Sequence, residues 1–260
     1  MNRKYTDKYV AFIDILGFRA LLEREGNDAS RISGLFDALI KCKDLSPRIN
    51  RFTNKRNPLR TIEEVYSSDK SVNLFQCYDA ALKDMIIKIV SDSIILATPV
   101  SDDFAFTVIV DACSFIAQYL LTYEEGYLVR GAITRGNVYF EEENVFFGEA
   151  YVRAYMMEKD SCLYPRIIYE NSYDQYPYAN SFGRTLTRCG DDGWGDIDYI
   201  GNYLGIHDDC WLEERERRLL SIVDREIQKN EKAPEICAKY RWVKSQIDRS
   251  REYVNARQNI

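Results

Sequence analysis

The chain has 260 residues, of which 46% are hydrophobic and 29% are charged. This composition provides enough apolar surface to bury a core, and it excludes an intrinsically disordered protein. The net charge of -6 argues against a surface that attracts nucleic acid or anionic membrane as a whole, so neither is expected as a partner.

Cysteine and histidine usage excludes several classes of active site. The seven cysteines are scattered and form no C-x-x-C pair, so we expect reduced, mostly buried thiols and neither a disulfide framework nor a zinc site. His207 is the only histidine, which excludes Ser-His-Asp triads and Cys-His dyads. A metal site would therefore use carboxylates, which bind hard ions such as magnesium or manganese. No apolar run approaches the roughly 18 residues of a membrane span, and the N-terminus lacks the apolar core of a signal peptide, so we expect a cytoplasmic protein.

In chain order, the first predicted element is a central strand buried on both faces. Residues 8–16, KYVAFIDIL, form an apolar run that ends at Gly17, and their one charged interior residue is Asp14. Apolar residues at helical spacing then predict a helix over 29–43 that covers the sheet. The periodicity fails from residue 44 to about 75, which predicts a long insertion. Its basic first half is interpreted as a solvated loop, with capture of a triphosphate as the alternative.

A hairpin follows the insertion. Two β-rich runs at 85–90 and 94–98 are joined by Ser-Asp92-Ser, so the sequence predicts Asp92 at the tip of a hairpin. A long amphipathic helix over 102–124 should pack against the sheet. Three further strands are predicted at 127–134, 137–140 and 165–169, and a short helix at 148–159.

The order β-α-β-β-α-β-β-α-β predicts an α+β fold, a ferredoxin-like palm with an antiparallel-rich sheet and helices over one face. Residues 170–210 show no clear period and are not assigned to elements. Two charged helices predicted over 211–229 and 234–255 form a C-terminal helical appendage, either for packing on the palm or for dimerisation. The predicted division is a palm domain at 1–170 and an irregular segment with the appendage at 171–260.

Asp14 and Asp92 are the candidate metal ligands. An aspartate late in a buried strand costs several kcal/mol unless a cation or a cluster of donors compensates its charge. In a palm, the hairpin that carries Asp92 lies beside the strand that carries Asp14, so the two carboxylates could share two divalent ions that neutralise a triphosphate. The alternative is structural: Asp14 caps the turn at Gly17, and Asp92 satisfies a tight hairpin.

Four segments, in the same order and with similar spacing, resemble motifs of class III nucleotidyl cyclases, the adenylyl and guanylyl cyclases. The first, Phe-Ile-Asp14-Ile-Leu-Gly17-Phe, resembles F-x-D-I-x-G-F. The others are Lys88-Ile-Val-Ser-Asp92-Ser, which resembles K-x-x-G-D-S; Val-Arg130-Gly-Ala-Ile-Thr-Arg135-Gly136, which resembles R-x-G-I-x-x-G; and Gly148-Glu-Ala before Glu158, which resembles G-D-A-V-N-x-A-x-R-x-E. The resemblance covers residues 8–169 and implies a nucleotidyl cyclase-like palm.

The resemblance also implies roles for the matching residues. Asp14, Asp92 and the backbone carbonyl of Ile15 would hold two divalent ions, Mg or Mn. The ribose 3′-hydroxyl of a nucleoside triphosphate would attack the α-phosphate, giving a 3′,5′-cyclic nucleotide and pyrophosphate, with Arg130 stabilising phosphate charge. The nucleotide-binding residues would be Gly17, Phe18, Lys88 and Arg135, with the amine of Lys88 on the base. Class III cyclases form head-to-tail homodimers, so a homodimer is implied.

Alternatives remain for three of these cations, because Lys88 could be a solvated or salt-bridged strand lysine, and Arg130 and Arg135 could form ordinary surface ion pairs.

The chain departs from the family pattern at several positions. Where the family has a transition-state asparagine and, four residues later, an arginine, this chain has Val152 and Met156, which cannot donate to a phosphate. Arg153 could substitute through a shift of register, or it could be an exposed helix residue. Val145 replaces the aspartate that reads adenine, so base specificity is not implied. Ser91 replaces the hairpin glycine, which is tolerable if the turn does not need a positive φ.

Three functions are compatible with these observations. The first is an active enzyme that cyclises a nucleoside triphosphate, similar to a divergent bacterial branch such as the pyrimidine cyclases that signal during phage infection. The second is a catalytically silent nucleotide-binding or dimerisation module. The third is a palm enzyme that joins nucleotides into oligomers. An enzyme is favoured, because a silent module leaves two carboxylates without a role.

Overall fold

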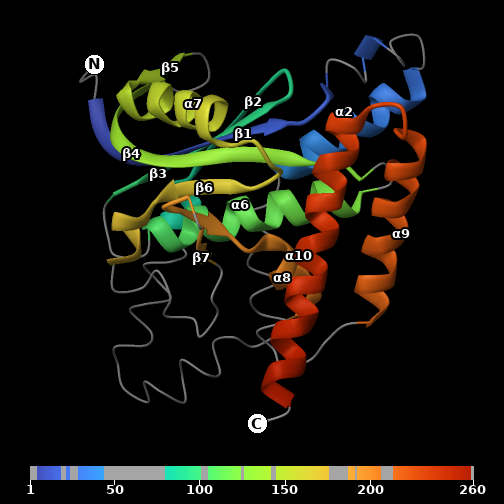
Figure 1. Cartoon of the computed structure of the whole chain (residues 1–260). Helices are drawn as coiled ribbons and strands as arrows, with labels where there is room; N and C mark the ends of the chain where they lie inside the picture. The colour runs from blue at the N-terminus through green and yellow to red at the C-terminus, as the bar shows by residue number, and fades with distance from the viewer. Residues whose placement is uncertain are drawn as a thin grey trace.

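The computed structural model describes residues 5–18, 22–23, 29–43, 80–100, 105–123, 126–141, 145–175, 187–190, 192–205 and 213–258. The predicted insertion at 44–75 and His207 lie outside these residues. The described part of the chain has an α+β fold, as predicted, in which helices pack on a mostly antiparallel sheet (Figure 1).

The sheet is built from strands far apart in the sequence. Its strands are β1 Tyr5–Ile15, β2 Ile86–Val90, β3 Ser93–Pro99, β4 Val129–Glu141, β5 Val145–Gly148, β6 Ile167–Glu170, β7 Thr187–Cys189 and β8 Trp194–Ile197. Their order is β2-β3-β1-β4-β6-β8-β7, with β5 paired to β4. Among these strands, β4 and β6 run parallel and the other neighbours are antiparallel.

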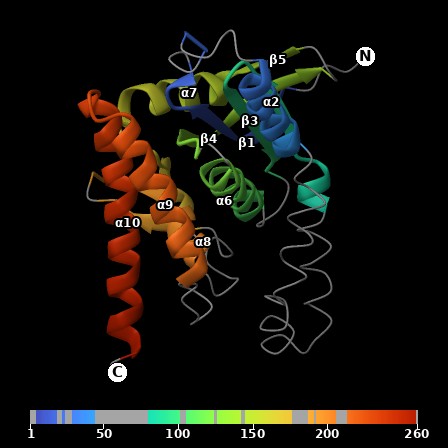
Figure 2. The ribbon, with the colours of Figure 1, turned by 90° about the vertical axis from the view of Figure 1, so that its right-hand side faces the viewer.

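Helices cover both faces of this sheet, whereas the sequence predicted helices over one face. They are α2 Ala29–Lys43, α6 Ala105–Thr122, α7 Glu149–Ser161, α8 Tyr199–Leu204, α9 Glu213–Lys229 and α10 Pro234–Gln258, with a 3-10 turn at Asn171–Gln175. Helix α7 packs on β1 and β4 from one side. Helix α6 packs from the other side, with α8, α9 and α10 beyond it (Figure 2).

The central strand β1 explains why a continuous apolar run is needed there. Tyr9, Ala11, Ile13 and Ile15 face the main core with α6, and the alternate residues Val10 and Phe12 face a second core under α7. Successive side chains of a strand point to opposite faces, so both sets are buried. Asp14 continues the second row, which places it on the α7 side of the sheet.

The prediction of two strands around Arg135 and Gly136 was wrong. Strand β4 is continuous, because Arg135 pairs with Tyr9 and Gly136 with Lys8 in an unbroken register with β1. A further strand, β5, occupies the apolar step before α7 and pairs with the end of β4.

Helix α6 corrects a second expectation. This 18-residue helix is long and apolar enough to cross a membrane by length and composition, although the sequence was expected to contain no such run. Most of its side chains are buried, and it packs against β1 and β3, so it is the core helix of this fold. Cys42, Cys113, Cys162 and Cys237 are buried and form no disulfide within the described part of the chain, as expected.

The C-terminal helices belong to the same core. Leu219 and Val223 of α9, together with Tyr240, Val243 and Ile247 of α10, are buried in the main hydrophobic cluster. Part of the region that the sequence left unassigned also joins the body of the protein, because β7 and β8 extend the sheet beyond β6 and α8 packs on α6 and α10.

Candidate functional site

The structure brings Asp14 and Asp92 together at one end of the sheet. Asp14 is the penultimate residue of β1, opposite Ser93 of β3 on one side and Arg130 of β4 on the other. The backbone N–H of Ile15 donates to the carbonyl of Asp92, with an N–O distance of 3.2 Å. The two aspartates, 78 positions apart in the sequence, are therefore neighbours across the β1–β3 pair.

Asp92 is held by the tight turn that the sequence predicted. Ser91 and Asp92 form the two-residue loop between β2 and β3, where Val90 pairs with Ser93. Ser91 has φ 58°, a left-handed conformation that residues other than glycine rarely adopt. The loop therefore does need a positive φ, and the serine at the position of the family's glycine is a strained substitution.

The charge of the Asp14 carboxyl is only partly compensated. Burial, and after it the neighbouring carboxylate of Asp92, raise its pKa to about 6, although Arg130 and the hydroxyl of Ser93 act in the opposite direction. Its side chain is only 22% exposed. A carboxyl with a raised pKa beside a second carboxylate is the electrostatic arrangement that an added cation would relieve.

Arg130 lies between two carboxylates. Its Nη2 is 3.8 Å from Oδ2 of Asp14, and its Nε forms an ion pair with Oε1 of Glu158. Glu158 is 2% exposed. Burial raises its pKa to about 7; Arg130 lowers the pKa, and Asp14 raises it. Asp14 and Glu158 thus share one guanidinium, which is a network rather than the ordinary surface pair considered from the sequence.

Helix α7 places Glu158 close to the sheet because the other residues of its buried face are small. Its buried face consists of Ala150, Ala154 and Glu158, spaced four residues apart. The two alanines allow the helix axis to approach the sheet, and Thr134 Oγ1 of β4 donates to the carbonyl of Ala150 at 2.7 Å. An acid in register with buried alanines is the sequence signal that could have identified Glu158 as a site residue.

The turn after β1 preserves the first motif. Gly17 has φ 79°, so the glycine is needed for its backbone conformation, and a Cβ there would meet no atom within 4 Å. Phe18 follows it and packs partly buried against the main core. Leu16 N–H donates to the carbonyl of Leu128 at 2.9 Å, which anchors this turn beside the start of β4.

Lys88 lies on the same face of the sheet as Asp14. It pairs with Ile95, which is opposite Phe12 in the next strand, and both of those residues face the α7 core. Its amine is 4.9 Å from the ring centroid of Phe140. Lys88 is thus on β2, two strands from Asp14 on β1 and on the same face of the sheet.

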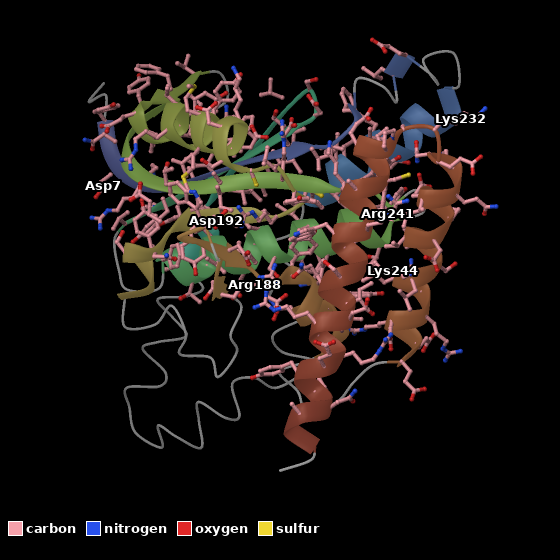
Figure 3. All side chains as sticks on the ribbon, in the orientation of Figure 1. Asp7, Arg188, Asp192, Lys232, Arg241 and Lys244 are labelled. Carbon is pink, nitrogen blue, oxygen red and sulfur yellow. The ribbon has the colours of Figure 1, made fainter. Side chains whose placement is uncertain are left out.

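Arg135 is not part of the site. It sits on the opposite face of β4, where its Nη2 pairs with Oδ2 of Asp7 at 2.7 Å and its guanidinium lies over the ring of Tyr9. Asp7 lies at the end of the sheet remote from α10 (Figure 3). The surface ion pair considered for Arg135 from the sequence is what the structure contains.

The structure also shows where the residues of α7 lie that differ from the cyclase motif. Val152 and Met156 are exposed, at 56% and 44%, on the outer side of the helix. Arg153 does not replace the missing asparagine at this site, because its guanidinium pairs with Glu170 at 2.5 Å and donates to the carbonyl of Arg135 at 3.2 Å. Val145 is a partly exposed residue at the start of β5.

Comparison with known proteins gives likeness of shape only. No family model and no curated protein matches the chain. A monomeric guanylyl cyclase domain of the RhoGC fusion protein from the fungus Blastocladiella emersonii is similar over 76% of this chain and 98% of its own, with 14% identity and a TM-score of 0.47. The adenylyl cyclase CyaB from P. aeruginosa is similar over 76% and 96%, with 16% identity and a TM-score of 0.46. A bacterial light-regulated adenylyl cyclase reaches 12% identity and a TM-score of 0.39 over 83% and 99%. Likenesses this low carry no information on activity, which has to come from the residues themselves.

The donor set suits a hard divalent cation. The described residues contain no group of three or more His, Cys, Asp or Glu side chains that could hold a metal, so the site offers two carboxylates and backbone oxygens. Oxygen donors of this kind bind magnesium or manganese, which keep several waters or substrate oxygens as further ligands. The raised pKa of Asp14 beside Asp92 is the observation that fits such an ion.

A separate pocket of about 380 Å³ shares no residue with this site. It lies between α6, α8 and α9 and is lined in part by Phe115, Tyr119, Tyr203, Arg215 and Arg218.

Proposed function

We propose that this protein is a divalent-metal-dependent nucleotidyl cyclase, which converts a nucleoside triphosphate to a 3′,5′-cyclic nucleotide and pyrophosphate. The observation that carries the proposal is the convergence of Asp14 and Asp92 from separate strands, with the pKa of Asp14 raised to about 6 beside a second carboxylate. Charge without compensation at a strand end is typical of functional sites, since a purely structural pair would be neutralised.

Each residue of the site would have a distinct task. Asp14, Asp92 and the carbonyl of Ile15 would hold two ions, magnesium or manganese, which when bound supply charge neutralisation and lower the pKa of the 3′-hydroxyl. Arg130 would leave Asp14 free for the metal by retaining its ion pair with Glu158, and its remaining donors would face the phosphates. Lys88 would contact the base from β2.

The protein's main contribution would be position. Nucleophile and electrophile belong to one molecule, so holding the ribose against the α-phosphate can reduce the barrier by about 7–11 kcal/mol. Gly17 and Phe18 would shape the turn beside the phosphates, as the resemblance of this segment to the first cyclase motif implies. The narrower assignment to bacterial pyrimidine cyclases of phage defence stays a prediction.

A homodimer is part of this proposal. Apolar side chains are exposed on α7 and β5, including Phe147 at 54%, Val152 at 56% and Met156 at 44%. Apolar residues gathered on one surface are typical of an interface, and the cyclase resemblance implies a head-to-tail pair. Sedimentation equilibrium should give the mass of a dimer, and Val152→Glu should reduce it to that of one chain. A stable wild-type monomer, unchanged by triphosphate and manganese, would contradict the shared site.

The second candidate function is a catalytically silent nucleotide-binding module. The observation that favours it is the apolar pair Val152 and Met156, since neither side chain can donate a hydrogen bond to a transition state.

One experiment separates the candidates. Purified protein is incubated with each of the four ribonucleoside triphosphates and manganese, and the products are identified by mass. A cyclic monophosphate supports the proposal, a linear or cyclic oligonucleotide indicates a palm enzyme that joins nucleotides, and absence of product indicates the silent module. Asp14→Ala and Asp92→Ala should each lower pyrophosphate release by about a thousandfold, because each removes a ligand of the charge-neutralising ions. Equal activity of both variants and wild type would exclude a role for the pair.

A further inference from the structure

The first turns of α10 are fixed beside Gly126, which lies just before β4 and four residues before Arg130. The hydroxyl of Tyr240 donates to the carbonyl of Gly126 at 3.3 Å, and both residues are buried. Ile222 of α9 packs so closely on Gly126 that a Cβ there would lie 2.3 Å from its side chain. The ring of Trp242 stacks on Tyr164, with centroids 5.9 Å apart. These contacts define where the neighbouring side chains of α10 can reach.

Figures 1 and 2 show the consequence for the sheet. The beginning of α10 and the α9–α10 turn lie at the same end of the sheet as the last residues of β1 and the first residues of β4 (Figures 1 and 2). That end holds Asp14 and Arg130, which face each other across the β1–β4 pair. A helix outside the resemblance to known cyclases therefore borders the carboxylate site.

Lys239 lies in the first turns of α10, which border this site. It immediately precedes Tyr240 and is half-buried, and within the described part of the chain its amine forms no hydrogen bond or ion pair. Burial and the charge of Arg130 lower its pKa, while Glu235 and Asp14 raise it, so its amine lies within range of the charges of the carboxylate site. A partly desolvated ammonium without a direct partner is costly unless a further anion contacts it.

The charge of the site calls for such a cation. Asp14 has Asp92 beside it, and within the described residues Arg130 is the guanidinium that pairs with Asp14 and Glu158; a bound triphosphate would add further negative charge. A lysine ammonium is compact, carries three donors and binds phosphate as a point charge.

We infer that Lys239 is a phosphate-binding residue, and that α10 completes the carboxylate site by placing its amine against the triphosphate. The inference rests on the proposed function for the kind of ligand, since it takes the bound anion to be a nucleoside triphosphate. It assigns the C-terminal helices a part in substrate binding in addition to packing.

The test uses inorganic tripolyphosphate with manganese as the probe, so that the unknown base does not matter. Its dissociation constant is measured by calorimetry on the full chain for wild type, Lys239→Gln, Lys239→Arg and Lys244→Gln. Lys244 is the matched control, because it lies on the same helix and is ion-paired with Asp224 at 2.8 Å (Figure 3). Losing one charge-assisted hydrogen bond should weaken binding about tenfold in Lys239→Gln, while Lys239→Arg retains most of the affinity and Lys244→Gln matches wild type.

The outcomes separate this inference from the proposed enzyme. If triphosphates give a cyclic product but Lys239→Gln keeps the wild-type affinity and KM, Lys239 has no role in phosphate binding and the enzyme proposal stands. If no triphosphate reacts, yet tripolyphosphate binds and Lys239→Gln weakens it, the binding residue is supported and catalysis is not. Absence of tripolyphosphate binding to wild type would overturn both. Thermal unfolding of each variant identifies any loss of affinity that comes from loss of the fold.

Discussion

Two clusters of charged side chains lie on the sheet, and their different charge balance distinguishes a site from a structural joint. The first is the carboxylate site: Asp14, Asp92, Arg130 and Glu158. The second, here called the β8 cluster, consists of Arg166, Arg188, Asp192 and Asp196. In the β8 cluster Arg166 pairs with Asp192, and Arg188 pairs with Asp196 and also donates to Gln246 of α10 at 2.5 Å. Asp198 lies nearby and caps α8.

The two clusters respond differently to their surroundings. The hydrogen bond from Arg166 lowers the pKa of Asp192. Burial raises the pKa of Asp196, but Arg188 and Arg166 both oppose this effect. In the carboxylate site the one arginine leaves the pKa of Asp14 near 6 and that of Glu158 near 7. Two arginines hold Asp192, Asp196 and the nearby Asp198 in a stable joint between sheet and α10, whereas one arginine for three acids leaves a place for an added cation.

Asp196→Ala should cause the largest change in stability. Asp196 is 3% exposed, and its removal leaves the guanidinium of Arg188 without its main partner between β7, β8 and α10 (Figure 3). Breaking a buried ion pair costs about 3–5 kcal/mol. Urea unfolding should show this loss, with the affinity for tripolyphosphate unchanged under conditions where the variant is folded. A loss below about 1 kcal/mol would show that Gln246 and Asp198 compensate Arg188 fully.

Manganese should stabilise the protein through the carboxylate site alone. At a concentration of about 100 times its dissociation constant, a ligand that binds only the folded state adds about 2.7 kcal/mol to the free energy of unfolding. Thermal unfolding with manganese and with EDTA should therefore differ for wild type and for Asp192→Asn, but not for Asp14→Asn or Asp92→Asn. If all four proteins respond alike, the ion binds elsewhere.

The sequence predicted part of the carboxylate site and none of the β8 cluster. Asp14 and Asp92 could be identified because a charge in an apolar strand and a charge at a hairpin tip are local features. Arg188 and Asp196 gave no such signal, because β7 and β8 are three and four residues long and their region has no period. The position of Lys239 near the carboxylate site could not be predicted either, since it depends on how α10 packs and not on the residues around Lys239 in the sequence. Local patterns predict elements, and long-range packing decides which charges meet.

Asp14→Asn should stabilise the fold at neutral pH. A carboxyl with a raised folded-state pKa binds its proton more tightly when folded, so its ionisation destabilises the fold as the pH rises from the ordinary value of 3.8 through about 6. Allowing for partial exposure, the amide should add about 2 kcal/mol at pH 7.5 without metal. The gain should shrink toward zero below about pH 3, where Asp14 is mostly protonated in both states. Urea unfolding in EDTA at both pH values measures it, and a less stable variant at pH 7.5 would mean that Arg130 and Ser93 outweigh the burial.

The smallest expected effect concerns the turns beside the two clusters. Ser91 precedes Asp92 at φ 58°, whereas the turn after Asp192 uses Gly193 at φ 85°, with no atom within 4 Å of a Cβ placed there. A left-handed conformation costs a residue other than glycine about 1 kcal/mol. Ser91→Gly should therefore raise the free energy of unfolding by about 0.5–1 kcal/mol, and Gly193→Ser should lower it by a similar amount. If Ser91→Gly stabilises the turn but also weakens manganese binding, the strained serine fixes the direction of the Asp92 carboxylate. The carboxylate site would then accept a lower stability to hold its geometry, and the β8 cluster would not.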